Sequence, residues 1–357
     1  MDLTETVHPV TTVDVSEALR LATRRGVPVL PVGGRRHLDR GNPGPVDLEL
    51  WTTQLDRVAS YEPAEMIAIV GSGMRVGALQ DMLADGGQEW PVDAPVDATV
   101  GGVIAAGVSS PRRLAVGQVR DSVLRVELVT GDGRIVRAGA PTVKQSAGYG
   151  ITRAMVGSLG TLGVLTEVAI KVRPLPKARR ALVADGDGLE LGQRMLETVP
   201  LPAAVVAEPN RAIVHVEGWP EEVEEQTGAA RKVTPIAIAD DASVPVPYPD
   251  AAIVAEVAVA PSRLAALLRD RPRWRALLGV GTAWVPLADP AELEELRADV
   301  SALGGIAPVV RGPGGLGPAP IPAGAVQRRL KEAFDPAGVL APGRGWLDAT
   351  APAATPG

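Results

Sequence analysis

Three separated glycine-rich turns, each next to a strand-like run, constrain this chain more than any other feature of its sequence. They are Gly33–Gly34 after "VPVLPV", Gly101–Gly102 in "ATVGG", and the stretch "GSLGTLG" at 157–163. Glycine lets a backbone approach a ligand closely because no Cβ stands in the way. Turns of this kind at several points indicate one extended ligand held by main-chain groups, and a dinucleotide has the required length.

Length and composition limit the class of protein. A chain of 357 residues exceeds one typical core, so we expect two domains. The net charge of −6 argues against a nucleic-acid partner, because binding phosphates needs a basic surface. The absence of cysteine excludes disulfides, thiolate zinc sites and iron–sulfur clusters in this chain.

The sequence predicts no membrane-spanning segment. The longest apolar runs, such as "AAIVAEVAVA" at Ala251–Ala260, are too short to span a bilayer and include Glu256. The N-terminal "MDLTETVHPV" lacks the pattern of a signal peptide. We therefore expect a cytoplasmic protein that would reach a membrane only peripherally, through partners.

Apolar periodicity divides the chain near Lys177. Before it, strand and helix signals alternate: a helix ending at Gly26, a strand over 27–32, a strand over 66–70, a helix ending at Gly86, and a hairpin over 122–139. From about 180 to 310, short strands alternate with helices over 261–270 and 290–305, which predicts a second α+β domain.

One stretch, "IAIVGSGMRVGAL", resembles a dinucleotide-binding fingerprint. Gly71 and Gly73 lie between a strand and a helix, but the third glycine is missing, since position 76 is Val76. No acidic residue follows at the distance that a ribose contact needs. We interpret the stretch as an ordinary strand–turn–helix.

A run of small residues follows the second glycine turn. Val103 to Ser110 offers little side-chain volume, and Asp121 then stands at the mouth of the next strand. Two interpretations apply: the backbone is kept close to a ligand, or the stretch is a tightly packed helix start. The other glycine clusters, including Gly148 within "KQSAGYG", favour the ligand.

Taken in order, these motifs resemble a known family. The segments "PVGG", "ATVGGVIAAGVSSPRR", "GQVRDSVL", "VKQSAGYG", "GSLGTLGVLTEVAIKVRPLP" and "FDPAGVLAPGR" follow one another as in FAD-linked oxidases of the vanillyl-alcohol oxidase and p-cresol methylhydroxylase type. More closely, the chain is similar to the FAD-binding subunits of bacterial glycolate oxidases. The resemblance runs from Val7 to Trp346.

The resemblance implies an α+β fold, with a two-part FAD-binding domain of that type and a reduced α+β cap domain. The implied boundaries are 1–177 for the FAD-binding domain, 178–322 for the cap, 323–347 for a C-terminal segment that returns to the FAD-binding domain, and 348–357 for a disordered tail.

It also implies which residues bind the cofactor. The first loop would hold the FAD pyrophosphate, the second turn would contact the flavin and ribityl chain, and the third would lie along the cofactor. The residues so assigned are Gly33, Gly34, Arg35, Arg36, His37, Thr99, Gly101, Gly102, Ala105, Ala106, Gly160, Thr161, Gly163 and Val164, with Asp121 as a further candidate.

Several polar positions depart from the family pattern. Arg35 and Arg36 stand where glycine and serine or threonine are usual, Gln145 and Gly150 replace an asparagine and an aspartate, and Ala341 replaces an asparagine. Arg35 or Arg36 would pair with the pyrophosphate through charge-assisted hydrogen bonds. An arginine adopts positive φ less readily than glycine, so the shape of this loop is an open question.

No catalytic centre for a 2-hydroxy acid stands out. The three histidines, His8, His37 and His215, lie far apart without metal-ligand spacing, so we assign no metal site and no catalytic residue. His215 alternates along a strand and is interpreted as structural. His37 is near the expected cofactor but is displaced from the position at which some relatives attach FAD covalently, so noncovalent FAD is expected.

The resemblance thus predicts an FAD-binding subunit of a glycolate-oxidase-like 2-hydroxy-acid dehydrogenase complex. A catalytic FAD-dependent hydroxy-acid dehydrogenase subunit and an iron–sulfur subunit would be separate chains. Two alternatives remain open: a stand-alone FAD-dependent hydroxy-acid or alcohol oxidoreductase, and a structural subunit that has lost FAD.

Overall fold

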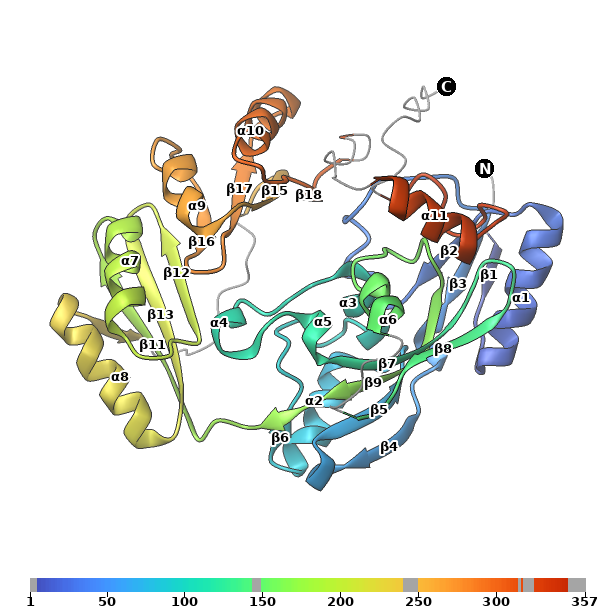
Figure 1. The fold of residues 1–357 in the computed structure, drawn as a ribbon, viewed down its shortest axis with the longest axis horizontal. Coiled ribbons are helices and arrows are strands. Elements are labelled where there is room, and N and C mark those ends of the chain that lie inside the picture. The colour runs from blue at the N-terminus through green and yellow to red at the C-terminus, as the bar shows by residue number, and fades with distance from the viewer. Residues whose placement is uncertain (1–4, 143–148, 240–249, 314–315, 317–323, 346–357) are drawn as a thin grey trace. The chain divides into compact units, whose positions relative to one another are not determined.

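The computed structural model describes residues 5–142, 149–239, 250–313, 316 and 324–345 (Figure 1). Its contacts divide the chain into two compact units. The first unit takes the described residues of Met1–Val108, Gln118–Leu175 and Pro320–Gly357, and the second takes Ser109–Gly117 and the described residues of Pro176–Ala319. The predicted tail, 348–357, lies outside the described residues.

The first unit combines parallel and antiparallel sheets with short helices. Its strands are β1 (Glu5–Val7), β2 (Val29–Val32), β3 (Leu48–Trp51), β4 (Val58–Glu62), β5 (Ile67–Gly71), β6 (Gln88–Glu89), β7 (Val123–Val129), β8 (Ile135–Gly139), β9 (Val164–Lys171) and β10 (Arg173–Pro174). A parallel sheet runs in the order β1-β3-β2, an antiparallel sheet runs β4-β5-β9-β7-β8, and β6 pairs with β10. The predicted hairpin over 122–139 is confirmed as the β7–β8 pair.

The helices of the first unit lie between these strands. They are α1 (Thr12–Arg25), α2 (Val76–Asp85), α3 (Val100–Ala106), α5 (Val119–Ser122), α6 (Tyr149–Met155) and α11 (Gly324–Phe334), with short 3-10 turns at Thr52–Gln54 and Pro63–Glu65. The predicted strand–turn–helix is confirmed as β5 followed by α2, and the predicted helix ending at Gly86 is this same α2.

Helix α1 shows how local sequence fixes an element here. Thr11 accepts a hydrogen bond from the backbone of Asp14 while the Asp14 side chain accepts one from the backbone of Thr11, so both ends of a capping box are present. Gly26 then ends the helix in the left-handed conformation at φ 65°. Val15 and Leu19 are fully buried in the core that lies between α1 and the parallel sheet. The helix predicted to stop at Gly26 is therefore confirmed.

A buried carboxylate anchors the C-terminal segment in the first unit. Asp335, just after α11, accepts hydrogen bonds from the backbone amides of Val339 at 3.1 Å and Leu340 at 2.8 Å. It also pairs with Lys331 Nζ at 2.7 Å. Leu340 forms a parallel bridge to Val29, so this segment extends the sheet beside β2.

The second unit is built on one long antiparallel sheet. Its strands are β11 (Ala178–Asp185), β12 (Ala204–Glu208), β13 (Arg211–Gly218), β14 (Ala237–Ala239), β15 (Ile253–Ala258), β16 (Arg275–Leu277), β17 (Thr282–Leu287) and β18 (Val309–Arg311), and its helices are α4 (Arg113–Val116), α7 (Gly188–Thr198), α8 (Pro220–Val233), α9 (Pro261–Leu268) and α10 (Pro290–Ala302). The order is β14-β11-β13-β12-β16-β17-β15-β18. Leu182 and Val205 on one face of the sheet share a core with Met195 and Leu264 of the helices.

The segment Ser109–Gly117 departs from the expected domain boundaries, which placed it in the FAD-binding domain. It belongs to the second unit, where Arg112 Nη1 donates to Glu217 Oε2 at 2.9 Å. Both side chains are buried, and Arg179 Nε lies 3.4 Å from the same carboxylate oxygen. A buried carboxylate needs a cationic partner, and this pairing draws the segment to the second unit.

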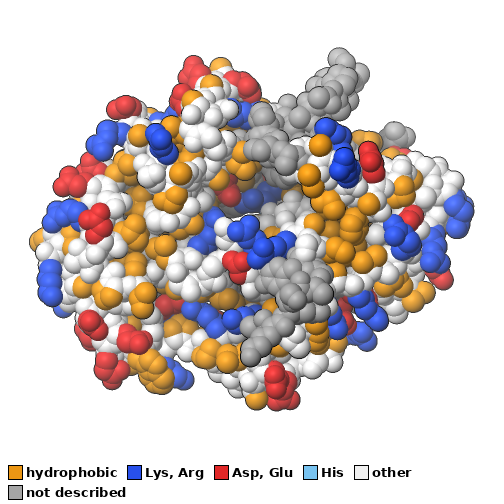
Figure 2. All heavy atoms as spheres, viewed as in Figure 1, with side chains coloured by type: hydrophobic (Ala, Val, Ile, Leu, Met, Phe, Trp, Pro, Cys, Tyr) orange, Lys and Arg blue, Asp and Glu red, His pale blue; other side chains and the backbone are white. Residues whose placement is uncertain are grey.

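The surface carries charges of both signs. On the face drawn in Figure 2, acidic and basic side chains are interspersed, in keeping with 36 basic and 42 acidic residues in the sequence. Within the described residues, none of the helices combines the length and the apolar character that crossing a lipid bilayer requires.

Candidate functional site

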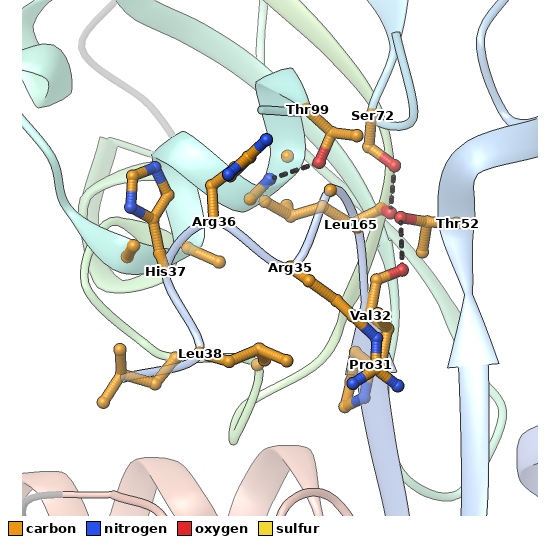
Figure 3. A pocket seen from close by; sticks show the side chains of 18 of the residues that line it. Pro31, Val32, Arg35, Arg36, His37, Leu38, Thr52, Ser72, Thr99 and Leu165 are labelled. Carbon is orange, nitrogen blue, oxygen red and sulfur yellow. Dashed lines mark hydrogen bonds between the residues drawn. The ribbon is translucent and has the colours of Figure 1, made fainter. Parts of the chain in front are cut away.

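The three glycine-rich turns of the sequence meet at one cavity in the first unit (Figure 3). The space between its walls, counted together with the solvent at its open side, is about 690 Å³. It is lined by Pro31, Val32, Gly33, Gly34, Arg35, Arg36, His37, Leu38, Thr52, Ser72, Ala98, Thr99, Gly101, Gly102, Ala105, Ala106, Leu159, Gly160, Gly163, Val164, Leu165 and Arg344.

Of the predicted cofactor-binding residues, all but Asp121 and Thr161 line this cavity. Asp121 accepts a hydrogen bond from the backbone amide of Gln118 at 2.9 Å and so caps α5. The Thr161 hydroxyl donates to the carbonyl of Ser158 at 2.7 Å and closes a turn. These two side chains shape the backbone beside the cavity, and their assignment to the cofactor stays a prediction.

The glycine pair after β2 allows the first loop to touch the second turn. A Cβ at Gly33 would overlap the Thr99 hydroxyl, and a Cβ at Gly34 would overlap the carbonyl of Asp97. Neither position tolerates a side chain, because a Cβ there would push the two turns apart. The close approach of these two backbones forms one wall of the cavity.

The second turn begins a buried helix. Thr99 Oγ1 accepts a hydrogen bond from the amide of Gly102 at 3.2 Å and caps α3. A Cβ at Gly101 would lie 2.7 Å from the Cβ of Ser72, so this helix packs directly on the turn after β5. The small-residue run is a tightly packed helix start, and Ala105 and Ala106 line the cavity. That the run keeps the backbone close to a ligand stays a prediction.

Ser72 is a lining residue that the sequence analysis did not select. Its hydroxyl donates to the carbonyl of Leu165 at 2.6 Å, which ties the turn after β5 to β9 (Figure 3). Ser72 lies between Gly71 and Gly73, in the stretch interpreted as an ordinary strand–turn–helix. Those two glycines were the signal that could have identified it.

Arg35 occupies a glycine-like position of the first loop. Its φ is 59°, in the left-handed region, which costs a residue other than glycine roughly 1 kcal/mol. Its guanidinium contacts both carboxylate oxygens of Glu49 at 2.5 Å and lies 4.9 Å from the centre of the Trp51 ring. These contacts offset the backbone strain, which answers how an arginine is accommodated in this loop.

Arg36 is also engaged by a carboxylate. Its Nε donates to Asp97 at 2.7 Å and its Nη2 contacts the same oxygen. The hydrogen bond and charge of Arg36 hold the pKa of the Asp97 carboxyl below its usual value. Arg35 and Arg36 point in different directions from the loop (Figure 3). Pairing of either arginine with a pyrophosphate stays a prediction, which the carboxylate contacts do not favour.

His37 is the histidine that lines the cavity. Its Nε2 is buried and makes no hydrogen bond within the described residues. Burial, with a smaller effect from the charge of Arg40, lowers the pKa of His37 to about 4. A neutral imidazole with an unsatisfied buried nitrogen is a suitable polar group for a ligand in this cavity.

The third turn forms a further wall of the cavity. Gly160 has φ 78°, and the amide of Leu159 donates to the carbonyl of Ala105 at 2.8 Å. A Cβ at Gly163 would lie 2.5 Å from a Leu128 methyl group. The glycines at this turn keep the backbone close to the neighbouring helix and strand. The predicted contribution of the cluster at 144–148 lies outside the described residues.

The other histidines lie elsewhere. His8 packs against Trp51 with 5.9 Å between ring centres, and His215 is buried in β13. Within the described ranges, no group of three or more histidine, cysteine, aspartate or glutamate side chains is placed to hold a metal ion.

Comparison with known proteins indicates which cofactor this cavity binds. Residues 4–139 match the family model described as "FAD binding domain". Glycolate oxidase subunit GlcE of Escherichia coli K12 is 36% identical over 151 residues, which are 40% of this chain and 43% of that protein. D-lactate dehydrogenase of Archaeoglobus fulgidus is 33% identical over 169 residues, and glycolate oxidase subunit GlcD of Bacillus subtilis is 30% identical over 181.

These matches cover part of each protein. The chain spans less than half the length of the three curated relatives, with 43%, 38% and 38% of them covered. The N-terminal region that matches the family model is an FAD-binding domain. The residues of the cavity fit that group, since glycine-lined walls meet the unsatisfied nitrogen of His37 there.

The fold expectation is confirmed by a solved structure. An alkyldihydroxyacetonephosphate synthase superposes with a TM-score of 0.68 at 16% identity, covering 94% of this chain and 76% of that one. The chain therefore has the α+β fold of FAD-binding proteins of the p-cresol methylhydroxylase type.

Proposed function

Because residues 4–139 form an FAD-binding domain, we propose that this chain is the FAD-binding subunit of a glycolate-oxidase-like 2-hydroxy-acid dehydrogenase complex. It is an FAD-dependent oxidoreductase subunit that holds FAD noncovalently. It works with a separate catalytic FAD-dependent hydroxy-acid dehydrogenase subunit and with an iron–sulfur subunit.

The observation that carries the proposal is the meeting of the three glycine-rich turns at one cavity. Gly33, Gly101 and Gly160 are far apart in the sequence, yet all three line the same space. Backbone that is free of side chains on several walls suits a long, flat, polar cofactor.

Each part of the cavity has its own role in this proposal. The loop from Gly33 to His37 meets the pyrophosphate, α3 with Thr99 and Ala105 meets the flavin and ribityl chain, and the turn from Gly160 to Val164 lies along the cofactor. His37 offers its neutral imidazole as a hydrogen-bonding group. Bound FAD supplies two-electron redox chemistry, and the protein supplies position and electrostatics.

The partners follow from chemistry that this chain lacks. The 357 residues contain no cysteine, so an iron–sulfur cluster with cysteine ligands requires another chain. GlcE and GlcD are each named as subunits of a glycolate oxidase, and a D-lactate dehydrogenase is a further relative. Glycolate and D-lactate are therefore the first substrates to test. The complex would work in the cytoplasm and reach a membrane only through its partners.

One preparation of the chain tests the proposal. The purified protein should show a flavin absorption spectrum, or acquire one when FAD is added, and acid denaturation should release intact FAD into the supernatant. A colourless protein that takes up no added FAD would contradict cofactor binding. Flavin that stays with the precipitated chain would contradict noncovalent attachment.

Adding substrate tests whether this chain oxidises a 2-hydroxy acid alone or only together with its partner chains. Glycolate or D-lactate should bleach the flavin only when the catalytic and iron–sulfur chains are added. Bleaching of the isolated chain by either acid would favour a stand-alone oxidoreductase instead. A folded chain that binds its partners without FAD would favour a structural subunit.

A further inference from the structure

Three arginines line the cavity, and one of them differs from the other two. The side chains of Arg35 and Arg36 are 47% and 53% exposed, and each contacts a carboxylate. Arg344 is only 9% exposed and comes from the C-terminal segment, far from the first loop in sequence. It was not among the residues that the sequence analysis assigned to the cofactor.

Arg344 holds the end of the first loop through backbone carbonyls. Its Nη2 donates to the carbonyl of Leu38 at 2.8 Å and to that of Arg40 at 2.7 Å. In return, the amide of Asn42 donates to the carbonyl of Arg344 at 3.1 Å. The loop from 38 to 42 therefore wraps around this one residue.

The backbone contacts around Arg344 are tight. A Cβ at Gly41 would lie 2.7 Å from the Arg344 carbonyl oxygen, and a Cβ at Gly44 would overlap the Pro342 carbonyl. Gly41 has φ 85°, a conformation that favours glycine. The position of the Arg344 guanidinium is thus fixed by the backbone on both sides.

The charge of Arg344 is incompletely compensated. Within the described residues no carboxylate lies at ion-pair distance from it, and its Nε and Nη1 make no hydrogen bond there. Burial lowers its pKa, and the nearby charge of Asp39 acts in the opposite direction. Neutral carbonyls offset only part of the cost of burying a cation, and an anion in the cavity would offset more of it.

We propose that Arg344 is the cationic side chain that contacts the diphosphate of bound FAD, while Arg35 and Arg36 stay on Glu49 and Asp97. This inference rests on the proposed function, because it takes FAD as the ligand. A guanidinium suits the role, since it can donate to loop carbonyls from one nitrogen and to phosphate oxygens from the others.

The test is a titration of the full-length, cofactor-free chain with FAD, followed by flavin fluorescence. Arg344→Gln should raise the Kd for FAD roughly 10- to 100-fold, the range of a hydrogen bond to a charged group. Arg344→Lys keeps the positive charge but loses the planar guanidinium with its several N–H donors. It should therefore raise the Kd for FAD less, by about 3- to 10-fold. Arg328→Gln removes the same charge from an exposed position of α11 and is the matched control.

Amide hydrogen exchange over residues 36–42 separates a direct contact from an effect on loop shape. Arg344→Lys should leave these exchange rates near wild type while FAD affinity falls. If affinity falls only in variants whose loop exchanges faster, Arg344 acts through loop shape alone and the inference is overturned. If Arg344→Gln does not fold, Arg344→Lys decides.

The two proposals fail in different ways. Wild-type protein that binds FAD, with variants that bind it equally well, overturns the role of Arg344 and leaves the proposed function standing. Wild-type protein that does not bind FAD overturns both.

Discussion

Replacement of His37 by glutamine should change how the stability of the protein depends on pH. The imidazole of His37 is largely buried beside the cavity, and its pKa is lowered to about 4. An unfolded chain returns the histidine to its ordinary pKa of about 6.5. Between these two values the unfolded state binds more protons than the folded state. Wild-type stability must therefore fall as the pH drops through this window.

The size of the effect follows from the two pKa values. At pH 7.5 His37 is neutral in both states and contributes almost no pH dependence. At pH 5 the unfolded state gains about 2 kcal/mol from protonation of this histidine, and below pH 4 the total approaches about 3 kcal/mol. Glutamine keeps a polar side chain of similar size and does not titrate, so His37→Gln should not lose this stability.

Urea unfolding of the FAD-free protein at pH 7.5 and pH 5.0 measures the difference. Wild-type protein should lose about 2 kcal/mol more than His37→Gln between the two pH values, since all other titrating groups are common to both. His37→Asn should behave as His37→Gln does. Parallel losses in wild type and both variants, within about 0.5 kcal/mol, would refute the reasoning that His37 is held neutral by burial.

Two further substitutions test the walls of the site. Gly34→Ala should abolish tight FAD binding and cost about 1–3 kcal/mol of stability, because its Cβ would overlap the Asp97 carbonyl. Gly228→Ala in α8, where a Cβ meets nothing within 4 Å, is the control, and equal FAD titrations for both variants would contradict the prediction. Asp335→Ala should cost about 3 kcal/mol in urea unfolding, because it leaves Lys331 and two amides without their buried carboxylate. The exposed Glu332→Ala should change stability little, and an Asp335 variant as stable as that control would show that the C-terminal segment is anchored otherwise.

Several elements of the first unit could be predicted from short-range sequence patterns. The apolar spacing of α1 with its stop at Gly26, and the β7–β8 hairpin around "GDG", depend on interactions within a few residues of one another. The glycine turns were equally visible, because glycine is retained where a side chain would overlap a neighbouring backbone. The family resemblance assigned most of the residues that line the cavity.

Contacts between distant parts of the chain could not be predicted from such short-range patterns. The segment Ser109–Gly117 has first-unit motifs on both sides, and its tertiary contacts, among them the buried pair of Arg112 with Glu217, place it in the second unit. Pairings of this kind depend on which surfaces meet after folding.

The sequence by itself determined α1, β2, the β5–α2 unit, the β7–β8 hairpin and the glycine-rich turns of the FAD-binding domain, because these depend on local periodicity and on where a Cβ is tolerated. Only the tertiary structure decided which arginines at the cavity pair with carboxylates and which one contacts backbone carbonyls. Arg36 reaches Asp97 across 61 positions, and Arg344 reaches Leu38 across 306. Ion pairing and burial of a charge are settled by neighbours in space, and a residue's own surroundings in the sequence do not reveal them.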